Sequence, residues 1–129
     1  MKKYTIEGLM KSAARGDLDA CHNLGARYAL GDEGVSKDEA EAVKWYTKAA
    51  EQGHAMSQYD LGFMFLLGEG TEKNVNTGIH WLEQAASNGD RQAAGLLKDI
   101  YLGGLFGVES NPDKASHWQT REEQLTGRT

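Results

Sequence analysis

The amino-acid sequence predicts an all-α protein, a stack of three helical hairpins preceded by one further helix. Three tryptophans, Trp45, Trp81 and Trp118, follow one another at intervals of 36 and 37 residues. Internal periods of this length are typical of helical-hairpin repeats, which bury a continuous core by stacking on one another. With 40% hydrophobic and 26% charged residues, the chain also has the composition of a globular protein.

Six further positions recur in the same register as the tryptophans. The middle repeat lacks one residue between Gly68 and Gly70, and such a deletion belongs in a loop. We expect a single repeat domain over residues 1–129, with the N-terminal helix at about 5–15 and the repeats at about 16–52, 53–88 and 89–125. The aligned sets are Gly16, Gly53 and Gly89; Leu24, Leu61 and Leu97; Tyr28, Phe65 and Tyr101; Gly31, Gly68 and Gly104; Gly34, Gly70 and Gly107; and Asp38, Asn74 and Asn111.

The N-terminal segment has the pattern of a second helix that lacks its partner. Leu9 lies 36 residues before Trp45, and Ala13 lies 36 residues before Ala49. We therefore expect the helix at 5–15 to cover the front of the stack.

The first helix of each repeat is expected to run from one recurring glycine to the next. In repeat one, Ala20, Leu24 and Tyr28 are spaced by four residues and line one side of a helix. Asp17 suits its N-terminal end, as Asp90 does in repeat three, and the closing glycines suit the C-terminal ends.

The second helices are expected to begin at the three recurring Asp and Asn residues, which are good N-caps. Pro112 follows the last of them, at the helical position that best tolerates proline. Ser36 and Glu39 could instead form a capping box, which leaves this boundary uncertain by about two residues.

Glycines inside the first helices, Gly25 and Gly62, predict close approach of helix axes. In the final helix, the positions of Tyr46, Ala49 and Ala50 are taken by Gln119, Glu122 and Glu123. Polar residues are expected there, because this helix has no further repeat to pack against.

Charge and cysteine content narrow the classes of partner and compartment. A formal net charge of −5 argues against nucleic acid, whose phosphates need clustered Lys and Arg. No stretch approaches the length needed to cross a membrane. Glu7, Lys11 and Arg15 interrupt the N-terminal apolar residues before a signal-peptide core could form. A single cysteine, Cys21, suits a reducing compartment, so we expect a cytoplasmic protein.

The segments Gly53-His-Ala-Met-Ser-Gln-Tyr-Asp-Leu-Gly-Phe-Met-Phe-Leu-Leu-Gly-Glu-Gly70 and Gly34-Val-Ser-Lys-Asp-Glu-Ala-Glu-Ala-Val-Lys-Trp-Tyr-Thr-Lys-Ala-Ala50 resemble the Sel-one-like repeat, a relative of the tetratricopeptide repeat. The resemblance runs from about Thr5 to Gln124. It implies a right-handed α/α superhelical solenoid whose first helices line a concave face. It further implies a non-catalytic adaptor or scaffold in protein complexes, mostly bacterial for short members. Lys98 departs from the pattern by replacing the helix-interior glycine, and we expect looser packing there.

Residues with catalytic or metal-binding chemistry do not form a recognisable set in the sequence. His80 and His117 share one repeat phase, but a third metal ligand at suitable spacing is missing, while His22 and His54 have no such relation. Cys21 lies on a packed helix and is expected to be a buried small residue. The sequence therefore predicts no enzyme, no cofactor and no metal site, with a small enzyme or a metal-dependent regulator as a lesser alternative.

Candidate partner-binding residues lie on the first helices, on the arc opposite the expected core residues Ser57, Leu61 and Phe65. In repeat two this arc is rich in aromatic and long aliphatic side chains, as a binding hot spot would be, whereas in repeat one it is far less apolar. Phe63 is the strongest candidate of the set. The predicted partner-binding residues are Met56, Tyr59, Asp60, Phe63, Leu66, Asp19, His22 and Asn23.

The charge distribution suggests the kind of partner. Residues 37–72 carry seven acidic side chains against three lysines, a net charge of −4. A patch of this sign would attract a basic partner, although a simply solvated face is the alternative reading. We expect a monomer or weak dimer that binds one protein, without nucleic acid or membrane. An immunity protein that neutralises a toxin domain is the alternative function.

Overall fold

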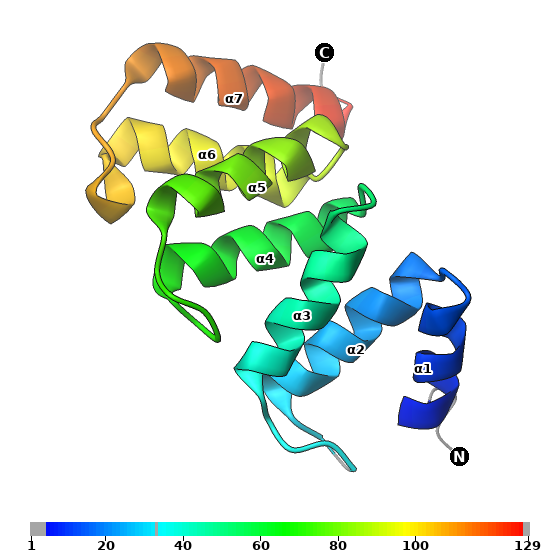
Figure 1. Cartoon of the computed structure of the whole chain (residues 1–129). Coiled ribbons are helices and arrows are strands. Elements are labelled where there is room, and N and C mark those ends of the chain that lie inside the picture. The colour runs from blue at the N-terminus through cyan, green and yellow to red at the C-terminus, as the bar shows by residue number, and fades with distance from the viewer. Residues whose placement is uncertain (1–4, 33, 128–129) are drawn as a thin grey trace.

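The computed structural model describes residues 5–32 and 34–127, and these fold into seven α-helices that follow one another as a curved stack (Figure 1). The ends of the predicted domain, residues 1–4 and 128–129, and residue 33 lie outside the described part. A three-residue 3-10 turn, η1, lies between the last two helices. The elements are α1 (Ile6–Ala14), α2 (Leu18–Leu30), α3 (Glu39–Ala50), α4 (Ala55–Leu67), α5 (Val75–Ser87), α6 (Arg91–Gly103), η1 (Leu105–Gly107) and α7 (Pro112–Thr126).

The second helices, α3, α5 and α7, begin where the recurring Asp and Asn residues predict. The side chains of Asp38, Asn74 and Asn111 accept hydrogen bonds from backbone N–H groups three residues ahead, at 3.1, 3.0 and 3.1 Å. The alternative capping box at Ser36 is wrong, because α3 begins only at Glu39. These caps satisfy N–H groups that have no partner within the helix.

Each helix packs mainly on its neighbours along the chain, so the stack grows one helix at a time. The predicted close approach is clearest between α4 and α5. A Cβ placed on Gly62 would lie 2.9 Å from the carbonyl oxygen of Gly78, so only glycine allows this separation. Gly25 plays the same part in repeat one, where the ring of Tyr46 would lie 2.7 Å from such a Cβ. Small residues therefore set the spacing between the two helices of each of these hairpins.

Polar side chains join the ends of successive hairpins. The amide of the buried Gln58 donates to the carbonyl oxygen of Ala50 at 3.0 Å and accepts from the side chain of Asn88 at 3.0 Å. In α7, the guanidinium of Arg121 donates to the carbonyl oxygens of Ala86 and Ser87 at 2.9 and 3.1 Å. Carbonyls at the end of a helix lack partners within it, so these bonds stabilise the repeat junctions.

The last helix is polar on its outer side, as predicted for the end of a stack. Its buried residues are Ala115 and Trp118, which join the core cluster that also contains Leu97. Where α2 and α4 carry a glycine, α6 carries Lys98, whose ammonium donates to the carboxylate of Glu122 at 3.0 Å. A partly exposed ion pair thus replaces the close glycine packing of the first two repeats.

Candidate functional site

A groove of about 410 Å³ opens between α2 and α4, on the side of the stack formed by the first helices. Tyr46 of α3 and Met64 of α4 form its floor, since each is only 5% exposed. Ala29 and Leu30, in the last turn of α2, form one wall. The other wall comes from α4. We call this cavity the α2–α4 groove.

The α4 wall of the groove carries an aromatic pair. The rings of Tyr59 and Phe63 lie one helical turn apart, with centroids 6.2 Å apart and planes tilted by 40°. Across the groove, the side chain of Leu30 is 80% exposed. Large aromatic and aliphatic side chains around a concavity supply most of the energy in a typical protein interface.

Carboxylates outnumber cations around the groove. Asp60 lies on the α4 wall, and Glu39 and Glu69 lie at the end where the loops meet, while Lys37 is the one basic side chain among the residues that line it. Burial, with the nearby Asp60 carboxylate, raises the pKa of the Tyr59 hydroxyl and that of Tyr46 above their ordinary values. Both phenols therefore stay neutral, and the electrostatics of the groove are set by the acidic side chains.

Two histidine–carboxylate bridges join α2 to α4 beside the groove. His22 Nε2 donates to Asp60 Oδ2 at 2.7 Å, and His54 Nε2 donates to Asp19 Oδ1 at 2.9 Å. The two imidazole rings lie 5.3 Å apart. The bridges hold the N-terminal half of α2 against α4, and the groove opens toward the C-terminal half of α2.

His54 also caps α4. Its Nδ1 accepts a hydrogen bond from the backbone N–H of Ser57 at 3.3 Å, which leaves the proton on Nε2 for the bond to Asp19. His22 and His54 share no repeat phase, as the sequence indicates, yet the fold brings their rings into contact. They lie 32 residues apart and at different repeat phases, so the alignment of repeats does not reveal that they meet.

The structure places the predicted partner-binding residues unevenly. Tyr59, Asp60 and Phe63 line the groove. The prediction for Leu66 is wrong: its side chain is 0% exposed and packs in the core, because the α4 arc that faces solvent is narrower than assumed. The remaining residues lie outside the lining of the groove: Met56, Asp19 and Asn23, which are exposed, and His22, which is turned toward Asp60.

Sequence reasoning missed the residues that complete the groove. Tyr46 lies on a second helix, where only packing within the scaffold was expected. Glu39 also belongs to this helix, α3, while Lys37 and Glu69 lie in the loops beside the groove. Leu30 could have been noticed in the sequence, because it is a large apolar residue on the solvent side of its helix. That it lines a groove could be seen only once α4 was placed opposite it.

The cysteine and the histidines of the chain lie outside the lining of the groove. Within residues 5–32 and 34–127, no three His, Cys, Asp or Glu side chains are placed to hold a metal ion. Cys21 is buried and unpaired, and burial raises the pKa of its thiol, which disfavours the nucleophilic thiolate. His80 and His117 are exposed, each with its ring edge against the tryptophan that follows it. In the part of the chain that the structure describes, no helix combines the length and the apolar character needed to span a bilayer.

Comparison with known proteins agrees with this architecture. A model of the Sel1 repeat family matches residues 18–54, 55–90 and 93–118. The chain is 37% identical over 105 residues to the chitin synthase regulator SKT5 of Saccharomyces cerevisiae, a stretch that covers 81% of this chain and only 15% of that protein.

Solved structures give the same result. A Sel1 repeat protein from Oxalobacter formigenes has a TM-score of 0.84 at 31% identity, over 91% of this chain and 46% of that one. The immunity protein PA5088 from Pseudomonas aeruginosa has a TM-score of 0.77 at 22% identity, over 93% of this chain and 45% of that one. These likenesses confirm the predicted all-α, right-handed superhelical solenoid. Sel1 repeat proteins are protein-interaction modules and in general non-catalytic scaffolds. The three matched repeats cover most of the chain, which therefore belongs to the Sel1 repeat family.

Proposed function

We propose that this chain is a non-catalytic bacterial adaptor that holds a segment of a basic protein partner in the α2–α4 groove. The observation that carries the proposal is the pairing of Tyr59 and Phe63 on one wall of a concavity whose opposite wall exposes Leu30. Membership of a family of protein-interaction modules supports the general function. The excess of carboxylates around the groove, where Asp60, Glu39 and Glu69 face the single Lys37, forms an acidic rim that supports a partner of positive charge.

Phe63 is the residue on which this proposal can be tested most directly. Phe63 lines the groove and is neither a core residue nor packed against the core, whereas Tyr59 packs against the core cluster that contains Leu97. Phe63→Ala should therefore weaken partner binding at least tenfold while leaving the melting temperature nearly unchanged. Truncation of Tyr59 would change both quantities and would be harder to interpret.

The experiment combines affinity capture from native lysate with calorimetry on the identified partner. Leu102→Ala is the matched control, because Leu102 is a 63% exposed apolar residue on α6 and lies outside the groove. Binding lost with Phe63→Ala and retained with Leu102→Ala supports the proposal. Equal affinities for the wild type and both variants would contradict it, as would a partner segment with no basic residue.

Immunity against a toxin domain stays a prediction. The likeness to PA5088 concerns the fold, while the acidic rim would suit a basic toxin. A one-to-one complex with a toxin encoded next to this chain, together with protection in a growth assay, would establish it. Growth arrest by that toxin despite expression of this chain would remove it.

Compartment, oligomeric state and chemistry complete the proposal. A buried thiol without a partner suits the reducing cytoplasm, where we place the protein. We expect a monomer or weak dimer, which light scattering after gel filtration would distinguish from larger assemblies. A stoichiometric metal in elemental analysis of the purified protein would favour the alternative of a metal-dependent regulator.

A further inference from the structure

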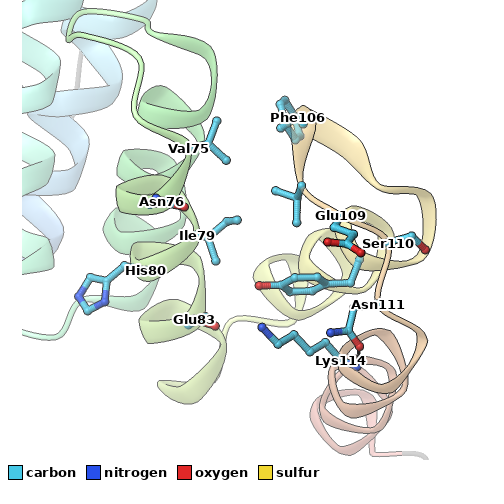
Figure 2. A pocket seen from close by; sticks show the side chains of 13 residues that line it. Val75, Asn76, Ile79, His80, Glu83, Phe106, Glu109, Ser110, Asn111 and Lys114 are labelled. Atoms are coloured by element: carbon cyan, nitrogen blue, oxygen red, sulfur yellow. Dashed lines mark hydrogen bonds between the residues drawn. The ribbon is translucent and has the colours of Figure 1, made fainter.

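A second cavity, of about 650 Å³, lies between α5 and the segment that joins α6 to α7 (Figure 2). It shares no lining residue with the α2–α4 groove. Val75 and Ile79 line it from α5, and Val108 and Tyr101 face them from repeat three. We call it the α5 cleft.

The α5 cleft exists because one loop is longer than its counterpart. In repeat two, Gly70 packs against the start of α3, so closely that a Cβ on it would overlap the carbonyl group of Glu39. The equivalent residue of repeat three, Gly107, has nothing within 4 Å of such a Cβ. The additional residue in repeat three therefore holds this loop away from α5. The contact that Gly70 makes with the start of α3 thus has no counterpart at Gly107.

Phe106 lies in this longer loop with φ 58° and ψ 29°. Among the residues that the structure describes, it is the only one other than glycine with a positive φ. A side chain in this left-handed region costs about 1 kcal/mol or more, and such backbone strain often marks a functional segment. Its ring packs partly on the core cluster of repeats two and three and forms the upper rim of the cleft (Figure 2).

The cleft has an apolar part and a charged part. Val75, Ile79 and Val108 are partly buried and make up its apolar lining. Val75 and Ile79 project from α5 toward the loop (Figure 2). Glu83 and Glu109 line the same cavity and make no ion pair within the described residues.

The single ammonium group in the lining is that of Lys114. Its Nζ lies over the ring of Tyr101, 5.2 Å from the centroid, so its charge already faces an aromatic surface. The carboxylates of Glu83 and Glu109 outnumber this one ammonium group, so the net charge of the lining is negative and complements a cation.

We infer that the α5 cleft is a second binding site, which takes an extended protein segment carrying an aliphatic side chain next to a lysine or arginine. The aliphatic side chain fills the space between Ile79 and Val108, where it takes the place of the loop contact that Gly70 makes with α3. The neighbouring cation pairs with Glu109, which lines the cleft and is exposed. A site of this size holds a short side-chain pair rather than a folded domain.

Three synthetic peptides test this site: acetyl-Gly-Leu-Lys-Gly-amide, its Leu-Glu counterpart and its Gly-Lys counterpart. Binding is followed by NMR through the methyl signals of Val75, Ile79 and Val108. The Leu-Lys peptide should give saturable shifts in the millimolar range, and the other two should bind at least threefold more weakly. Shifts that do not saturate, or that are as large with the Leu-Glu peptide, would overturn the proposal.

Variants with matched controls locate the interaction. Glu109→Gln should weaken binding of the Leu-Lys peptide about three- to fivefold, the range of an exposed ion pair. Glu72→Gln, at the equivalent position of repeat two, should leave it unchanged. Deletion of Phe106 should close the cleft and abolish the shifts without unfolding the protein, which circular dichroism would verify. Equal affinities for the Glu109→Gln and Glu72→Gln variants would overturn the assignment. Phe63→Ala is expected to leave peptide binding intact, so this test is independent of the α2–α4 groove.

Discussion

His22 and Asp60 form a hydrogen bond of 2.7 Å that joins the first helices of two successive repeats. The imidazole is largely buried, with its side chain 14% exposed, while the carboxylate is 34% exposed and also lines the α2–α4 groove. One aspartate thus both stabilises the repeat interface and faces the proposed partner. Changes at this residue should therefore affect stability and binding together.

A double-mutant cycle should reveal this coupling. His22→Gln and Asp60→Asn are each expected to lower the free energy of unfolding, with a coupling energy of about 1 kcal/mol because the two side chains share one hydrogen bond. Urea unfolding of the four proteins measures it. Combining His22→Gln with Asp99→Asn on α6 provides the control, for which the two effects should add. A coupling indistinguishable from that control would contradict the bridge.

His54 is expected to stabilise α4 mainly as its N-cap. His54→Ala removes the acceptor for the Ser57 N–H and should cost about 1 kcal/mol of unfolding free energy. His54→Asn restores a good N-cap and should recover most of this loss, although the bond to Asp19 is not replaced. Thermal denaturation of both variants distinguishes the two roles. If the asparagine and alanine variants are equally unstable, the bridge to Asp19 matters more than the cap.

Gly62→Ala should destabilise the protein despite the higher helix propensity of alanine. The new methyl group would meet the carbonyl oxygen of Gly78 at 2.9 Å, and α5 would have to move away, at an expected cost of about 1–3 kcal/mol. Gly95→Ala is the control, because its methyl group would meet only the movable carboxylate of Glu122. That variant should be neutral or more stable by up to about 1 kcal/mol. Chemical denaturation that ranks the two variants the other way would contradict the packing.

Asp90 predicts a dependence of stability on pH. Burial raises the pKa of its carboxyl above the ordinary value of 3.8, and the bond from the Ala93 N–H opposes this only in part. Since the pKa is higher in the folded state, ionisation opposes folding. This penalty is present at pH 7 and disappears as the pH falls through the folded-state pKa.

Asp90→Asn keeps an N-cap without the charge, so it should equal or exceed the wild type in stability at pH 7. The difference should shrink toward about pH 4 in urea unfolding. The same substitution at Asp17, the exposed cap of α2, serves as the control. A difference between wild type and Asp90→Asn that grows on acidification would show that the sign is wrong.

Most of the fold could be predicted because its determinants are local. The N-caps Asp38, Asn74 and Asn111 and the closing glycines act within one helical turn, and the tryptophan period reports the length of each hairpin. Part of the candidate groove was also accessible, since Tyr59 and Phe63 stand out as large apolar residues on one arc. Leu66 was misassigned because a periodic pattern gives the centre of a buried face but not its width.

The sequence by itself determined an all-α repeat stack, the ends of its helices and the polar character of its last helix, because each depends on residues within a few positions of one another. The tertiary structure alone decided where the surfaces open. The His22–Asp60 bridge joins residues 38 positions apart. The floor of the groove at Tyr46 and the α5 cleft beside Gly107 depend on how helices and loops of successive repeats pack on one another. These relations follow from the angle and spacing between hairpins, which are set by the packing of all their side chains together.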